Sequence, residues 1–160
     1  MSKRAVPIFS ALSREDALAL IERNHIGRLA FTFHDRVDIE PISYVYSDGW
    51  LYARTSEGTK LITVKHHPWV AFEVDEVTSR LEWQSVVVRG AMYILEPERD
   101  DSSVHARAIE VLRSVDPDAF TDADTTPFRR AVFRIHVDEV TGRRASPASP
   151  ASPASPASPA

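Results

Sequence analysis

The chain has 160 residues, with 19 basic and 23 acidic side chains, a net charge of −4 and no cysteine. The lack of cysteine excludes disulfide scaffolds, thiol nucleophiles and cysteine-based metal sites, and it fits a reducing cytoplasm. The acidic balance disfavours nucleic acid as a partner, because such binders concentrate positive charge to neutralise phosphates. No segment approaches the roughly 20 consecutive apolar residues of a membrane span. We therefore expect a cytoplasmic protein with no membrane partner.

The first predicted element is an amphipathic helix that follows an N-terminal arm over residues 1–12. Ser13 to Asp16 has the pattern of an N-cap box. Apolar residues then recur at helical spacing at Ala17, Leu20 and Ile21. Gly27 is placed where a glycine commonly ends a helix.

From Arg28 the pattern changes to short runs rich in β-branched and aromatic residues, which are typical of strands. Turn-forming residues such as Ser47-Asp48-Gly49 separate neighbouring runs, so we expect mostly antiparallel pairing. The predicted strands cover residues 29–33, 37–46, 50–54, 69–74, 82–95 and 130–137. A brief helical segment is expected over about 58–65, and a second long helix is expected after Pro97, up to Val115.

Residues 145–160 form a repeated Ala-Ser-Pro tract. A proline at every third position opposes both helix and sheet, and no side chain larger than alanine is present to build a core. The sequence therefore predicts a folded domain over residues 13–144 and a disordered tail over 145–160. The order of elements indicates an α+β protein dominated by a small antiparallel barrel, and the pattern alone allows several kinds of barrel.

The most informative stretch runs from Leu51 to Leu61. A strand ends in Arg54, the hydroxyls of Thr55 and Ser56 follow, and Thr59-Lys60 opens a short helix. Cations, hydroxyls and free helix amides in one place suit a phosphate monoester. The spacing is not that of a P-loop, which disfavours triphosphate chemistry. A capped turn with solvated Arg and Lys side chains would explain the same residues.

Six short motifs follow one another in a recognisable order, at residues 26–30, 40–46, 48–52, 58–61, 67–75 and 85–90. On these motifs the chain resembles the pyridoxamine 5'-phosphate oxidase-like FMN-binding split-barrel family, particularly its small branch of nitroimidazole-resistance-type reductases. The likeness extends from about Ser13 to Gly142. It implies a six-stranded antiparallel split β-barrel with two flanking helices, assembled as a homodimer with FMN at the subunit interface.

The resemblance also assigns candidate cofactor-binding residues. Those along the flavin ring are Pro41, Ile42 and Ser43. Those near the ribityl phosphate are Arg54, Thr55 and Ser56, together with Lys60, which matches the phosphate-binding lysine of the family. Gln84 and Ser85 match a region that reaches the flavin from the other subunit. Many relatives have Arg-Lys where this chain has Thr59-Lys60, which removes one positive charge from the phosphate site.

The leading hypothesis is an FMN-dependent oxidoreductase that takes electrons from NAD(P)H and reduces a small electron-poor acceptor. Oxidation of pyridoxamine phosphate is less compatible, because the chain lacks the arginine-rich C-terminal extension of that branch. Two alternatives remain open: a reductase using the 8-hydroxy-5-deazaflavin coenzyme, and a non-catalytic module that holds flavin or haem. No residue can be assigned as catalytic. No metal site is predicted, since His66-His67 is better explained as a pair ending a helix.

Overall fold

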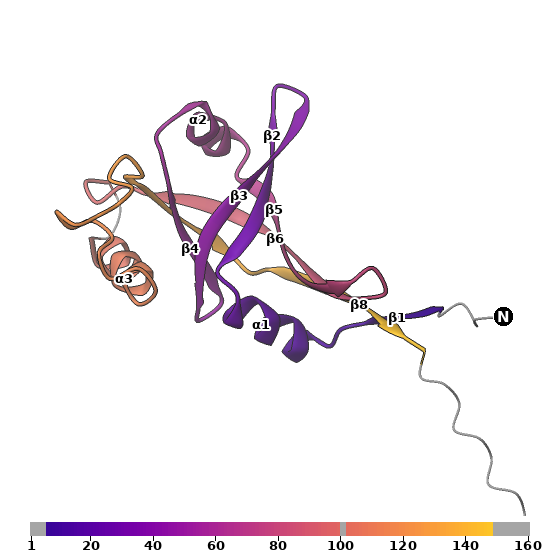
Figure 1. Cartoon of the computed structure of the whole chain (residues 1–160). Helices are drawn as coiled ribbons and strands as arrows, with labels where there is room; N and C mark the ends of the chain where they lie inside the picture. The colour runs from indigo at the N-terminus through magenta and orange to yellow at the C-terminus, as the bar shows by residue number, and fades with distance from the viewer. Residues whose placement is uncertain (1–5, 100–101, 149–160) are drawn as a thin grey trace, which may run out of the picture.

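The computed structural model describes residues 6–99 and 102–148. Within these residues the chain forms three helices and eight strands (Figure 1): β1 (Pro7–Ala11), α1 (Arg14–Arg23), β2 (Ile26–Phe33), β3 (Arg36–Ser47), β4 (Trp50–Thr55), α2 (Thr59–His66), β5 (Trp69–Ser79), β6 (Glu82–Leu95), α3 (Ser102–Arg113), β7 (Ala131–His136) and β8 (Glu139–Pro147).

All strands pair antiparallel, in the order β1-β8-β6-β5-β2-β3-β4-β7, and an additional pairing of β6 with β7 closes the sheet on itself. Closure is possible because β6 is 14 residues long. Residues 83–89 of this strand pair with β8, and residues 92–95 pair with β7. The α+β class and the antiparallel split barrel are therefore confirmed. The structure has eight strands instead of the predicted six.

The two additional strands lie in segments that the sequence did not mark as strands. Residues 7–11 of the predicted arm form β1, which pairs with β8. Ala145 to Pro147, predicted to be disordered, form the end of β8, and Ala145 is buried. Backbone pairing with β1 and β6 overrides the weak strand preference of this composition. The rest of the predicted tail, residues 149–160, lies outside the described residues.

The main core fills the barrel, with Tyr44, Phe72 and Phe133 as its largest fully buried side chains. Leu20 and Ile21 of α1 join this core. A second, smaller core lies between α3 and the outer face of the sheet. It comprises Tyr52, Leu95, Ala108, Val111, Leu112 and Val132. In Figure 1 the three helices lie on different sides of the curved sheet, and β1 and β8 extend away from the rest.

The ends of α1 show one confirmed prediction and one correction. The Ser13 side chain accepts a hydrogen bond from the Asp16 amide at 3.0 Å, as expected for the N-cap. Gly27 does not end the helix, which stops at Arg23 with Asn24 as its C-cap. Gly27 lies in β2, where a Cβ atom would come within 2.2 Å of the Phe72 ring. This glycine therefore serves close packing inside the barrel.

Candidate functional site

Two adjoining cavities lie along β3 and β4 and share Arg54 and Arg129. One has a volume of about 360 Å³ and is lined by Pro41, Ile42, Thr55 and Ser56, among others. The other has a volume of about 400 Å³ and includes Ser43. We call the pair the β3–β4 groove. Larger hollows lie beside α2 and α3, but this groove collects the residues that the sequence singled out.

The structure brings most of the predicted cofactor-binding residues together in this groove. Pro41 and Ser43 are exposed on β3, whereas Ile42 is buried. Thr55 ends β4 and is buried, and Ser56 follows it as an exposed residue. Lys60 lies in the first turn of α2, but its side chain lies outside the described part of the structure. Its predicted contact with phosphate stays a prediction.

The N-terminus of α2 opens beside these hydroxyls. Gly58 is the N-cap residue, it lines the groove, and it supplies no side-chain capping bond. The first turn also contains no acidic residue. Helix N-termini carry unpaired amide groups and a partial positive charge, which attract anions. The N-terminus of α2 next to Thr55 and Ser56 therefore fits a phosphate group, although the carboxylates of Glu40 and Glu57 also line the cavity.

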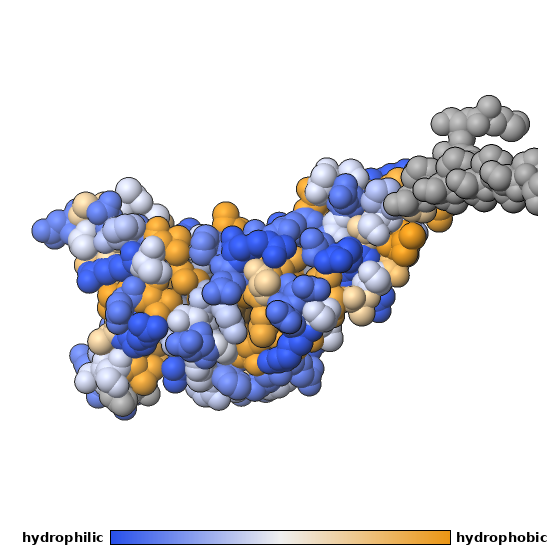
Figure 2. Space-filling model, turned by 90° about the horizontal axis from the view of Figure 1, so that it is seen from below, coloured by the Kyte–Doolittle hydropathy of each residue, from blue (hydrophilic) through white to orange (hydrophobic). Residues whose placement is uncertain are grey.

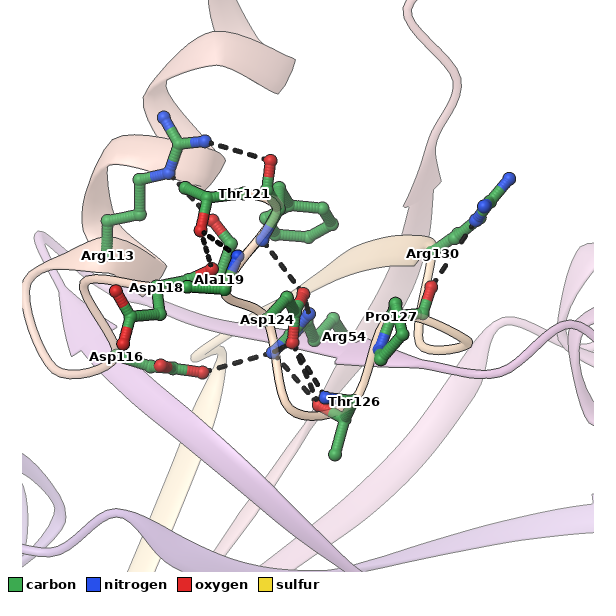
Figure 3. Close-up of polar contacts among 12 residues, drawn as sticks. Arg54, Arg113, Asp116, Asp118, Ala119, Thr121, Asp124, Thr126, Pro127 and Arg130 are labelled. Carbon is green, nitrogen blue, oxygen red and sulfur yellow. Dashed lines mark hydrogen bonds and ion pairs between the residues drawn. The ribbon is translucent and has the colours of Figure 1, made fainter.

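Arg54 lines the same cavity, and its guanidinium holds the loop between α3 and β7 (Figure 3). Its guanidinium donates to Asp124 at 2.5 and 3.0 Å, to Asp116 at 3.0 Å and to Thr126 at 3.0 Å. The side chains of Arg54 and Asp124 are only 10% and 3% exposed. These carboxylates engage the guanidinium of Arg54. The predicted role of Arg54 at a phosphate stays a prediction.

This ion pair changes the acidity of both partners. Hydrogen bonds from Arg54 and from the Phe120 amide hold the pKa of the Asp124 carboxyl well below its usual range. The hydrogen bond to Asp124 in turn raises the pKa of Arg54. The Arg54 guanidinium also lies 4.9 Å from the centroid of the Phe120 ring, at a residue with a positive φ of 62°. Arg113 also donates to the carbonyl oxygens of Ala119 at 2.8 Å and Phe120 at 3.3 Å, so Arg54 and Arg113 together hold the loop.

Sequence reasoning missed the part of this loop that walls the groove. Phe128 is 62% exposed at the rim, and Arg129 lines both cavities. Among the residues that the structure describes, Arg129 has no carboxylate partner, and its guanidinium lies 5.9 Å from the Phe128 ring centroid. It therefore adds a positive charge to the cavity that Gly58, at the N-terminus of α2, also lines. The only sequence signal was an Asp-x-Thr turn at Asp124, which suggests an ordered loop but not its position.

Gln84 and Ser85 lie apart from the groove, near the start of β6. The Ser85 hydroxyl donates to Glu73 at 3.0 Å, and the Gln84 carbonyl oxygen accepts from Arg144 at 3.2 Å. Successive side chains of a strand point to opposite faces of the sheet. The two residues therefore occupy opposite faces of β6. Their contact with a flavin from a second subunit stays a prediction.

Comparison with known proteins gives the family. A family model described as pyridoxamine 5'-phosphate oxidase matches residues 13–144. The chain belongs to the pyridoxamine 5'-phosphate oxidase family. It is 27% identical over 142 residues to an uncharacterized protein of Rhizobium meliloti, a match that covers 84% of this chain and 93% of that protein.

Solved structures of similar proteins have the same fold. A FAD-binding protein from Mesorhizobium loti is 28% identical, with a TM-score of 0.72, and the match covers 87% of this chain and 99% of that chain. A structure named for 5-nitroimidazole antibiotic resistance, from Bacteroides thetaiotaomicron, has a TM-score of 0.66 at 16% identity, covering 89% of this chain and 90% of that one. The second likeness concerns the fold alone. The predicted family resemblance is confirmed.

Two further observations concern the described part of this family member. Among residues 6–99 and 102–148, no three His, Asp or Glu side chains gather in a way that could hold a metal ion. None of the helices in the same ranges has the length and apolar character needed to cross a membrane.

Proposed function

We propose that this protein binds a flavin, as FMN, in the β3–β4 groove and works as a flavin-dependent oxidoreductase. The observation that carries the proposal is the gathering of Thr55, Ser56 and the N-terminus of α2, which has no acidic residue in its first turn, at one end of the groove. Apolar Pro41 and Ile42 lie along the same cavity. Such a groove offers a polar anchor for a phosphate and an apolar edge for a flat ring. The FAD-binding relative from Mesorhizobium loti supports a flavin as the ligand.

Each group of residues has a separate task in this proposal. The Thr55 and Ser56 hydroxyls and the α2 amides bind the phosphate, and Lys60 adds the charge-assisted bond. Arg129, the cation that the sequence did not single out, provides a second positive charge at the groove. Residues 41–43 orient the ring through their backbone groups, as Ser43 and Pro41 are exposed on β3. Arg54 positions the loop that forms the opposite wall.

When bound, the flavin supplies hydride or electron transfer, and the protein supplies binding, orientation and electrostatics. We propose NAD(P)H as the electron donor and a small electron-poor molecule as the acceptor. The groove is open enough for such an exchange, because Ser43, Ser56 and Phe128 are exposed at its edge. The cysteine-free composition supports a place in the cytoplasm.

The outer face of β2 and β3 supports a homodimer. Ile26, Val37 and Ile39 are exposed by 63%, 79% and 61%, respectively. The β2–β3 register pairs Ile26 with Ser43 and Arg28 with Pro41, so the apolar face is continuous with the groove. Exposed apolar surface that adjoins a binding groove is typical of a subunit interface. A second subunit seated there would bring its own outer sheet face, which carries Ser85, towards the flavin.

The absorption spectrum of the purified protein, followed by titration of the stripped protein with FMN, tests the proposal. We expect a yellow protein and saturable FMN binding. Lys60→Ala should weaken FMN binding by about 1.5–3 kcal/mol, the worth of a hydrogen bond to a charged group. Lys65→Ala at the other end of α2, where Lys65 pairs with Glu96, is the matched control and should leave FMN affinity unchanged. A colourless protein that binds no added FMN would overturn the proposal.

Three readouts separate the alternatives on the same fold. Binding of FAD or of the deazaflavin coenzyme in preference to FMN would change the proposed cofactor but would leave the proposed binding site in the groove unchanged. Tight FMN binding without any NAD(P)H oxidation in the presence of nitro or quinone acceptors would favour a non-catalytic flavin carrier. A sharp Soret band on titration with haem, without FMN binding, would favour the haem-binding module.

A further inference from the structure

A second hollow, separate from the β3–β4 groove, lies between the C-terminal half of α2, the end of β6 and the first turns of α3. Its volume is about 560 Å³. Part of its wall is apolar, from Pro68, Ile94 and Val104, and charged side chains complete it: Lys65, Glu96, Arg99 and Arg134. The proposed flavin site uses none of these residues.

Arg134 is the unusual member of this hollow. It lies on β7 between two tyrosines, paired with Tyr52 of β4 and Tyr93 of β6. Its guanidinium lies 3.7 Å from the centroid of the Trp50 ring, a close cation–π contact. Its Nε atom is buried and has no hydrogen-bond partner among the described residues. No carboxylate of the described chain forms an ion pair with Arg134.

An arginine with a buried, unsatisfied nitrogen requires an explanation, because buried polar groups are almost always hydrogen-bonded. The Trp50 ring holds the face of the guanidinium but accepts no conventional hydrogen bond from its edge. Stacking therefore fixes the orientation of Arg134 without neutralising its charge. A guanidinium held in this way is preorganised for an oxyanion, which it can meet with two parallel N–H groups.

The other charged side chains of the hollow also leave positive charge in excess. Lys65 approaches Glu96 at 2.6 Å, and Arg99 approaches the same carboxylate at 3.4 Å. Among the described lining residues, three cations thus face one carboxylate. A ligand that enters the hollow meets an excess of positive charge next to an apolar wall.

We propose that this hollow binds a small organic anion. Its oxyanion, a phosphate or a carboxylate, would be held by Arg134 with Arg99 and Lys65 nearby, and its body would lie against Pro68, Ile94 and Val104. Because no residue of the proposed phosphate site for the flavin lines this hollow, the proposal does not depend on flavin binding.

Calorimetric titration with matched charged and neutral probes tests the site and identifies the anion. AMP and adenosine differ by a phosphate, and benzoate and benzamide differ by a carboxylate. Saturable binding of AMP but not adenosine assigns a phosphate ester, and binding of benzoate but not benzamide assigns a carboxylate. If neither AMP, benzoate nor inorganic phosphate binds saturably to the wild-type protein, the proposal is wrong.

Variants locate the binding within the molecule. Arg134→Gln should raise the dissociation constant of the probe by about tenfold or more, the effect of losing a charge-assisted hydrogen bond. Arg36→Gln, at an exposed arginine of β3, is the matched control and should bind the probe like the wild type. FMN affinity should be unchanged in Arg134→Gln. Loss of probe binding in Lys60→Ala, with Arg134→Gln unaffected, would place the anion in the flavin groove and overturn the assignment.

Arg99→Gln keeps the test decisive if Arg134→Gln fails to fold. The side chain of Arg99 is 78% exposed, so its replacement should leave the fold intact. It should still lower the affinity for the probe. Equal probe affinity in Arg99→Gln, Lys65→Gln and the wild type would contradict a site in this hollow.

Discussion

Inside the barrel, Leu20, Tyr44 and Phe133 are fully buried among apolar neighbours supplied by several strands and by α1. The loop over residues 114–130, in contrast, is held by polar contacts of Arg54 and Arg113. Many individually weak apolar contacts together stabilise the interior. In the loop, the Arg54 guanidinium joins Asp116, Asp124 and Thr126. The interior should therefore tolerate conservative apolar changes. The loop should respond to a single substitution, although the barrel beneath it stays folded.

The largest loss of stability is expected where an added side-chain atom in the interior would collide with a neighbouring backbone. At Gly90 of β6, a Cβ atom would come within 1.8 Å of the carbonyl oxygen of His136. Gly90→Ala should reduce the free energy of unfolding by about 3 kcal/mol or more, at or beyond the upper end for overpacking, because the backbone at His136 must move away from β6. Urea unfolding measures it. Gly58→Ala, with open space around the position, is the control, and equal losses in both variants would contradict this account.

The loop should be released by Arg54→Met, which keeps much of the side-chain length but removes all the donors. Asp124, with a side chain only 3% exposed, would then lack its cation. We expect the melting temperature to fall by several degrees and amide protection to be lost over residues 116–129, while protection in β5 and β6 is retained. Hydrogen exchange measures this. Arg36→Met is the exposed control, and uniform loss of protection throughout the barrel would show that the loop is not a separate unit.

Tyr44 joins the interior to α1 through one polar bond, since its hydroxyl donates to the Ile21 carbonyl at 2.6 Å. Burial also raises the pKa of this hydroxyl. Tyr44→Phe leaves the ring in place but removes the donor, so it should reduce the free energy of unfolding by about 1–2 kcal/mol. Thermal and urea unfolding measure the change. A loss as large as that of Gly90→Ala would mean that the hydroxyl has a wider role than this bond.

The smallest expected effect is a difference in acid sensitivity. The folded pKa of Asp124 lies below its usual value, so its ionised form stabilises the fold fully above the unfolded pKa. This stabilisation fades as the pH falls through the folded value. The gap in melting temperature between the wild type and Asp124→Asn should be constant near neutrality and narrow only below about pH 4. A gap that is independent of pH down to acid unfolding would argue against ionic fixation of the loop.

The sequence predicted the strands that alternate between buried and exposed positions, because that alternation reports directly on the core. β7 is an example, with Phe133 and Ile135 buried and Arg134 partly exposed. It missed β1 and β8, because β1 is almost wholly exposed and β8 ends in the Ala-Ser-Pro composition of the tail. Their pairing comes from the sheet edge that β6 offers, which is a property of the tertiary fold.

The candidate site likewise contains residues that the sequence could place together and residues whose position only the structure reveals. Residues 41–43 and 54–56 lie on two hairpin-connected strands, so local sequence and family resemblance could place them together. The contact between Arg54 and Asp124 joins residues 70 positions apart, and no local pattern reports it. Arg129 belongs to a loop without periodicity, so its position beside the groove also required the structure. The phosphate and ring contacts themselves remain predictions.

The surface offers several apolar regions besides the one beside the groove. Figure 2 shows hydrophobic side chains among charged ones on the face seen from below. Some of these hydrophobic side chains lie at the end of the molecule from which the terminal segments leave. Near that end Phe9 of β1 is 65% exposed, and its ring lies 6.2 Å from that of Trp83. This pair of one exposed and one half-buried aromatic ring lies away from α3 and from the loop that follows α3 (Figure 1).

The placement of β8 bears on how the chain can be shortened. Cutting before Ala145, at the apparent start of low-complexity sequence, would remove the residues that pair with Pro7, Ile8 and Phe9. The amino-terminal strand would then lose most of its attachment, and a row of unsatisfied backbone groups would invite association between molecules. A cut after Ala148 spares that ladder. Fusion partners attached there would leave from the side of the molecule opposite α3 (Figure 1).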